Sequence, residues 1–140
     1  MSISKQTIYK IDYFMSILVL VCVMMHSVSC VWLMIGENNS DSWIRNPVYG
    51  LNVKYGEEEL EDGSFETNRQ TKYITSFYWA VTTLATVGYG DVKGFTWQEY
   101  MFNMFVEFIG IAFFSFVMGS INNIFLVDSS SKELVQTKLE

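Results

Sequence analysis

Charge is absent from long stretches of this 140-residue chain, in which half of the residues are hydrophobic. Residues 13–35 contain no Lys, Arg, Asp or Glu, and residues 100–127 contain Glu107 as their one charged side chain. A helix rises about 1.5 Å per residue, so the first stretch covers roughly 34 Å, enough to cross a bilayer core of about 30 Å. A cleaved signal peptide does not explain it, because the apolar run is too long and no small-residue cleavage site follows. The two stretches therefore predict two membrane-spanning helices.

Cysteine and clusters of basic residues are also scarce. Cys22 and Cys30 both lie in the first apolar stretch, where helical rise separates them by about 12 Å, too far for a disulfide. They are best interpreted as small apolar side chains. No basic cluster indicates nucleic acid as a partner. The positive-inside rule does not fix the orientation, because residues 36–72 contain as many basic residues as the two ends together.

A third apolar segment is too short to span. Residues 73–85 are aromatic and apolar but only 13 long, which fits a re-entrant helix. They lead into Gly88 and Gly90, and residues 92–96 form a short return. Non-helical backbone is tolerated within a membrane only where protein buries it or water bathes it. A lone copy provides neither, whereas several copies around an axis would.

The loop after this short helix consists of Thr86, Val87, Gly88, Tyr89 and Gly90. If the loop faces a shared axis, its carbonyls can replace the water shell of a dehydrating cation. Alternate residues then need unusual φ values, which Gly88 and Gly90 adopt without a Cβ penalty. Thr86 would add a hydroxyl ring, while Val87 and Tyr89 point away. The negative, C-terminal end of the short helix would favour a cation waiting below the loop.

TVGYG loops form the selectivity filter of potassium channels, and this chain resembles the pore domain of that family. The resemblance extends from about residue 20 to about residue 127. It includes the segments Lys72–Trp79 and Met118–Ile121, which are similar to those of ether-à-go-go, plant Shaker-like and cyclic-nucleotide-gated channels. The voltage sensor and the cyclic-nucleotide-binding domain of that superfamily are not in these 140 residues. They are expected as partners if the chain belongs to a longer parent channel.

The resemblance implies an all-α membrane protein in which two transmembrane helices flank a re-entrant pore helix and a filter loop. It further implies a homotetramer in a lipid bilayer, expected in the plasma membrane, that conducts K⁺ without an organic cofactor or catalysis. The expected segments are an interfacial lead (1–12), an outer helix (13–35), an extracellular turret (36–71), a pore helix with filter (72–92), an inner helix (97–127) and a cytoplasmic tail (128–140).

Two other functions compete with potassium selectivity. One is a weakly selective cation channel of the hyperpolarisation-activated kind, which also has a Gly-Tyr-Gly loop. Thr86 and Asp91 argue against it, because the loop of those channels is similar but has other residues at both positions. The other is a non-conducting regulatory subunit, against which the intact filter argues. In related pores, an acid after the filter bonds to an aromatic residue of the pore helix. We expect Asp91 to bond Trp79, or as second choice Tyr78, with a solvated carboxylate as the alternative.

Two ionisable residues lie within the spans. His26 is either a neutral side chain hydrogen-bonded to a neighbouring helix, which we favour, or a proton sensor. Glu107 is either buried behind the filter or in contact with water at the outer end. In the turret, the acidic run from Glu57 to Asp62 is a solvated loop tip or a vestibule that concentrates cations. Asn38 begins a glycosylation sequon close to the membrane.

The inner helix carries the candidate gate. Phe114, Met118 and Asn122 recur every four residues and share one face. This face forms either apolar rings that close the inner pore by dewetting or a helix-packing stripe. Gly110 and Gly119 are candidate hinges that allow bending or close approach.

Overall fold

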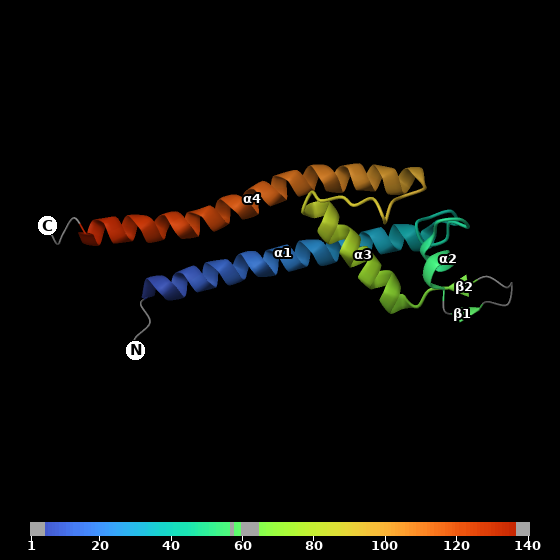
Figure 1. Ribbon diagram of the computed structural model, residues 1–140, viewed down its shortest axis with the longest axis horizontal. Coiled ribbons are helices and arrows are strands. Elements are labelled where there is room, and N and C mark those ends of the chain that lie inside the picture. The colour runs from blue at the N-terminus through green and yellow to red at the C-terminus, as the bar shows by residue number, and fades with distance from the viewer. Residues whose placement is uncertain (1–4, 57, 60–64, 137–140) are drawn as a thin grey trace.

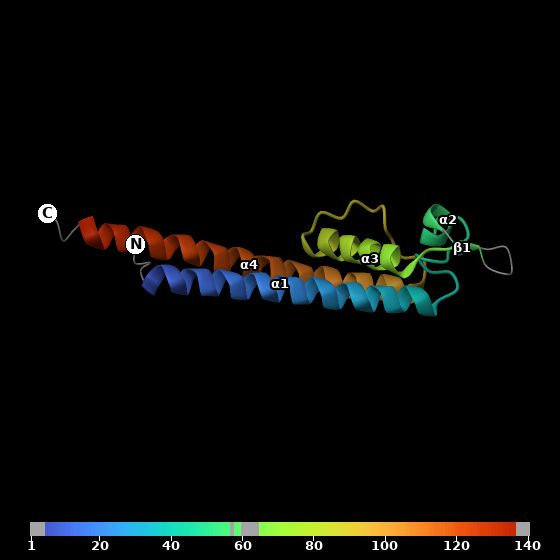
Figure 2. The ribbon, with the colours of Figure 1, turned by 90° about the horizontal axis from the view of Figure 1, so that it is seen from below.

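The computed structural model describes residues 5–56, 58–59 and 65–136, and Figure 1 shows their arrangement. The elements in chain order are α1 (Lys5–Asn38), α2 (Leu51–Tyr55), β1 (Glu58–Glu59), β2 (Phe65–Glu66), α3 (Arg69–Leu84) and α4 (Trp97–Gln136). Helices α1 and α4 lie side by side, and the start of α1 and the end of α4 are at the same end of the pair. Figure 2 shows that α3 and the loop after it lie on one side of this pair.

The expected fold class is confirmed. Within α1 and α4, Ile8–Asn38 and Trp97–Asn123 are long and apolar enough to cross a membrane, so the chain is an integral membrane protein with two spanning helices. The shorter α3 lies between them in sequence and packs against both. A small antiparallel sheet, in which Glu58 pairs with Glu66, adds the β structure of the described residues.

The helices extend beyond the expected segments. The structure begins α1 at Lys5, so residues 5–12 of the expected lead are its first turns. Helix α3 begins at Arg69, three residues early, whereas α4 begins at residue 97 as expected and continues through residues 128–136 of the expected tail. Hydropathy reports which residues leave water. Helical hydrogen bonding joins backbone groups and can continue into polar residues, so a helix outlasts its apolar run.

Four aromatic side chains join the three long helices and the turret. The Trp32 ring stacks on Trp79 with ring centroids 3.9 Å apart and on Trp43 at 5.9 Å. Phe102 of α4 lies 6.3 Å from both Trp32 and Trp79. Each buried aromatic side chain removes about 150–250 Å² from solvent, so this cluster is the main apolar core of the chain and lies directly behind α3.

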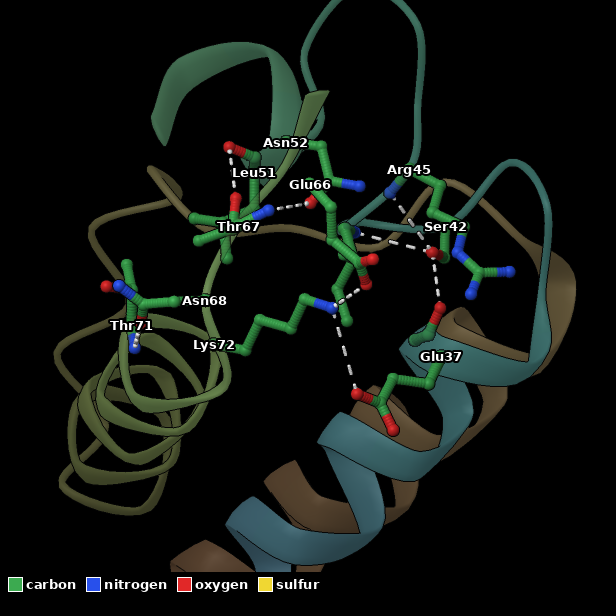
Figure 3. Close-up of polar contacts among 12 residues, drawn as sticks. Glu37, Ser42, Arg45, Leu51, Asn52, Glu66, Thr67, Asn68, Thr71 and Lys72 are labelled. Atoms are coloured by element: carbon green, nitrogen blue, oxygen red, sulfur yellow. Dashed lines mark hydrogen bonds and ion pairs between the residues drawn. The ribbon is translucent and has the colours of Figure 1, made fainter. Parts of the chain in front are cut away.

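The turret, residues 36–71, is held by buried polar contacts, several of which Figure 3 shows. The Ser42 hydroxyl donates to the Gly36 carbonyl at 2.6 Å. The fully buried Thr67 donates its hydroxyl to the Leu51 carbonyl at 3.3 Å and its backbone N–H to the Asn52 side chain at 3.1 Å. These bonds order the described part of the turret. Most of the acidic run, Glu57 and residues 60–62, lies outside the described residues.

Candidate functional site

The glycine loop begins as a continuation of the last turn of α3. The Thr82 carbonyl accepts hydrogen bonds from the backbone N–H groups of Val87, at 2.9 Å, and Gly88, at 3.2 Å. The Thr86 N–H donates to the Thr83 carbonyl at 3.0 Å. Carbonyls at the end of a helix otherwise lack partners, so these bonds fix the start of the loop. Figure 2 shows the loop running back along α3.

Backbone φ is positive at every second residue of the loop: 59° at Thr86, 57° at Gly88 and 75° at Gly90. This confirms the expected φ values at the two glycines. In an ordinary strand successive carbonyls alternate in direction, and alternating the sign of φ lets them turn toward one side instead. Thr86 shares this conformation, in which a β-branched residue is strained.

Asp91, the residue after the glycine loop, is bound by α3. The Tyr78 hydroxyl donates a hydrogen bond to the Asp91 carboxylate, and this bond is the main cause that raises the pKa of the Tyr78 phenol. Tyr78 was the second choice. Trp79, the first choice, is 4% exposed and stacks on Trp32 in the core. On a helix, neighbouring residues face different directions, and here Trp79 faces α1 while Tyr78 faces the loop.

Glu99 supports the other end of the loop, and the sequence analysis did not single it out. Its side chain is fully buried. One carboxylate oxygen accepts from the N–H groups of Phe95, at 2.8 Å, and Thr96, at 3.0 Å, and the other accepts from Trp43 N–H at 3.0 Å. Thr96 and Glu99 form a capping box, a Ser/Thr followed three residues later by Glu. That spacing is the sequence signal that could have predicted the contact.

Lys72 joins the start of α3 to the turret and to α1, as Figure 3 shows. Its buried ammonium lies 2.5 Å from a Glu66 carboxylate oxygen and 3.9 Å from one of Glu37. The hydrogen bond from Lys72, followed by its charge, lowers the pKa of Glu66. Asn68 caps α3, because its side chain accepts from the Thr71 N–H at 2.8 Å. The helix that carries the loop is therefore anchored at its first turn.

His26 and Glu107, which lie within the two apolar stretches, differ in their surroundings. His26 Nδ1 lies 2.8 Å from the Tyr73 hydroxyl, which is the hydrogen bond to a neighbouring helix that the favoured interpretation expected. Glu107 is exposed on α4 and accepts from Asn103 Nδ2 at 2.7 Å. Within one chain, Glu107 is therefore not buried behind the filter.

The candidate gate and hinge residues lie on α4. Phe114, Met118 and Asn122 are exposed on the single chain. Gly110 is buried, and a Cβ built there would lie 3.4 Å from the Leu84 Cα. Gly110 therefore permits close approach of α4 to the end of α3. No atom lies within 4 Å of a Cβ built on Gly119.

The candidate glycosylation residue, Asn38, is the exposed last residue of α1. Cys22 and Cys30 are both free thiols.

Known proteins are similar to this chain in sequence. Residues 48–126, more than half of the chain, match the family model described as "Ion channel". The potassium channel AKT1 of Arabidopsis thaliana is 32% identical in an alignment of 112 residues that covers 75% of this chain and 11% of AKT1. The human voltage-gated delayed rectifier potassium channel KCNH5 is 25% identical in an alignment of 139 residues that covers 88% of this chain and 14% of KCNH5.

The matched part of the chain coincides with the site. Residues 48–126 run from the turret through α3 and the glycine loop into α4. The chain spans little more than a tenth of the length of these two relatives. The similarity is to an ion-conducting protein and not to an enzyme. The chain thus belongs to the ion channel family and is a pore domain distantly similar to plant and KCNH potassium channels.

Proposed function

We propose that the chain is the pore-forming subunit of a potassium-selective channel, and that four copies surround one axis. The backbone carbonyls of the filter coordinate K⁺ as it passes and replace its hydration shell. These carbonyls belong to Thr86, Val87, Gly88, Tyr89 and Gly90. The observation that carries this proposal is the alternation of positive φ at Thr86, Gly88 and Gly90, which is the backbone requirement of a row of carbonyls on one side.

The exposure of the loop supports assembly. Val87 is 52% exposed and Tyr89 is 70% exposed on the single chain, although the loop belongs to a re-entrant segment between two spanning helices. Bare loop backbone at membrane depth has to be covered by protein or bathed by water. A ring of identical subunits provides both, since neighbours cover the back of each loop and the axis is a water-filled path. Closed rotational symmetry is the usual arrangement of such assemblies.

The remaining segments take roles that follow from this arrangement. The turret faces outside, and the end at which α1 begins and α4 finishes faces the cytoplasm. The exposed face of α4 with Phe114, Met118 and Asn122 lines the inner pore, and Gly119 is a point where the helix can bend. The tetramer resides in the plasma membrane, where K⁺ passes down its gradient.

Reversal potentials of the purified protein in planar bilayers test the proposal. Under opposing K⁺ and Na⁺ gradients, a selective pore reverses close to the potassium equilibrium potential. A reversal midway between the two potentials would indicate the weakly selective pore. The absence of current from tetramers of verified fold would indicate a non-conducting subunit.

A further inference from the structure

Lys93 lies two residues beyond Asp91, and its ammonium is held over two aromatic rings. Tyr49 of the turret and Phe95 of the return segment stack with an angle of 2° and ring centroids 6.3 Å apart. We call this pair the aromatic shelf. The Lys93 ammonium lies 5.9 Å from the Tyr49 centroid and 5.7 Å from the Phe95 centroid. Both distances are within the roughly 6 Å over which a cation is attracted to a ring face.

The shelf lies in a groove next to the return segment and not on the loop from Thr86 to Gly90. Tyr49, Phe95 and Lys93 line a groove of about 660 Å³ between the turret, α3 and the return segment. Of the described residues that line this groove, none belongs to the loop from Thr86 to Gly90. The shelf therefore holds a positive charge on the turret side of the return segment.

The acid and the base of this return segment have separate partners. Asp91 accepts a hydrogen bond from Tyr78, and Lys93 is over the shelf. In the described part of the chain these two side chains form no ion pair with each other. Positive charge near a narrow opening lowers the local concentration of cations, and negative charge raises it. In a tetramer, four released ammonium groups near the outer mouth of the pore would oppose the field of four Asp91 carboxylates.

We propose that the aromatic shelf keeps the Lys93 ammonium away from the outer mouth of the pore and thereby sets the rate at which K⁺ enters from outside. This inference rests on the proposed function. An exposed contact between an ammonium and one ring raises the population of the bound position by about two- to fivefold. Removal of one ring therefore releases the ammonium for much of the time. The effect is greatest at low ionic strength, because the screening length is roughly 30 Å at 0.01 M salt and 3 Å at 1 M.

Single-channel recording of Tyr49→Leu and Phe95→Leu tests the shelf, each alone and combined with Lys93→Gln. We expect each single variant to lower the inward unitary K⁺ conductance by about twofold at low ionic strength, with little change near 1 M salt. Addition of Lys93→Gln should restore the conductance. The matched control is Tyr55→Leu, which removes an exposed ring of the same groove that contacts Lys54 instead. It should conduct like the wild type.

Chemical labelling gives a readout that does not depend on conduction. A membrane-impermeant amine reagent, followed by mass spectrometry, should modify Lys93 at least twofold faster in Tyr49→Leu than in the wild type or Tyr55→Leu. Unchanged labelling, or a conductance loss that persists after Lys93→Gln, would overturn the inference. If the wild type conducts K⁺ selectively and the shelf variants have the same conductance and the same labelling of Lys93, only this inference is overturned. Absence of any wild-type current would overturn the proposed function together with it.

Discussion

The backbone N–H of Trp43 donates to a buried Glu99 carboxylate oxygen at 3.0 Å, across 56 positions of sequence. Trp43 belongs to the turret, and Glu99 is in the first turn of α4, just after the filter and its return segment. The same carboxylate caps α4 through Phe95 and Thr96. One side chain therefore fixes the outer end of the inner helix to the turret, while Lys72 and Tyr78 fix the pore helix and the residue after the filter.

Replacement of Glu99 should destabilise this frame. In Glu99→Gln, an amide NH₂ would face backbone N–H groups, so one or two buried donors lose their acceptor at a cost of about 1–3 kcal/mol. Thermal unfolding of the purified protein in detergent, followed by tryptophan fluorescence, measures this loss. The matched control is Glu107→Gln on the same helix. The Glu107 side chain is exposed, so this substitution should change the free energy of unfolding by less than about 0.5 kcal/mol. Equal stability of the two variants would contradict the role of Glu99.

Acid should weaken the contact between Lys72 and Glu66. The Glu66 pKa is lowered from its ordinary value of 4.5. The contact therefore contributes its full stability above pH 4.5 and loses it as pH falls through the lowered pKa. Because Glu66 is partly exposed, we expect Lys72→Met to cost about 1 kcal/mol or less and to flatten the pH dependence of stability below pH 4.5. The control Lys54→Met removes an exposed turret cation and should retain the wild-type pH dependence. If Lys72→Met and the wild type lose stability identically below pH 4.5, this result would argue against the contact between Lys72 and Glu66.

Gly88→Ala should abolish selective K⁺ conduction. No atom lies within 4 Å of a Cβ built at Gly88, so the constraint within one chain is its φ of 57°. A side chain in this left-handed conformation costs about 1–2 kcal/mol, and relief of that strain would turn a carbonyl. The control is Gly119→Ala, which also has open space for a Cβ but no positive φ. Reversal potentials should shift for the first variant only, and a selective Gly88→Ala channel would argue strongly against the filter assignment.

Tyr78→Phe should loosen the outer end of the filter without disturbing the core. The variant keeps the ring and removes the hydroxyl that donates a hydrogen bond to the Asp91 carboxylate. We expect about 1–2 kcal/mol less stabilisation of the conducting filter, because the bond is to a charged group. This should appear as a several-fold shorter conducting lifetime in single-channel records. Tyr100→Phe, on an exposed position of α4, is the control and should record like the wild type.

Met118→Ala should alter gating and leave selectivity unchanged. The side chain is exposed on α4, and in the proposed tetramer it narrows the inner pore as an apolar ring. A smaller ring dewets less readily, so the open probability should rise about threefold or more while the reversal potential stays constant. Altered permeability ratios would show that this face of α4 does not have the proposed position at the inner pore.

Much of this fold follows from simple patterns in the sequence. The two uncharged stretches predict the two spans, and the 13-residue apolar segment predicts a helix too short to span. The spacing of Gly88 and Gly90 predicts two of the three positive φ values. These features depend on local composition, which a sequence displays directly.

The contacts that hold the site depend on which residues face one another. Trp79 and Tyr78 are adjacent and both aromatic, so composition does not tell which one reaches Asp91. Glu99 binds a residue of the turret that is distant in sequence, and only its local capping box was visible. Lys72 is buried although it is charged, because Glu66 and Glu37 reach it from two other elements.

A density map of the purified protein in potassium salt tests the central claim most directly. The account predicts four copies related by fourfold rotation, with a central column of ion density flanked by the carbonyls of Thr86 to Gly90. A map with another symmetry, or with these carbonyls turned away from an empty axis, would contradict it.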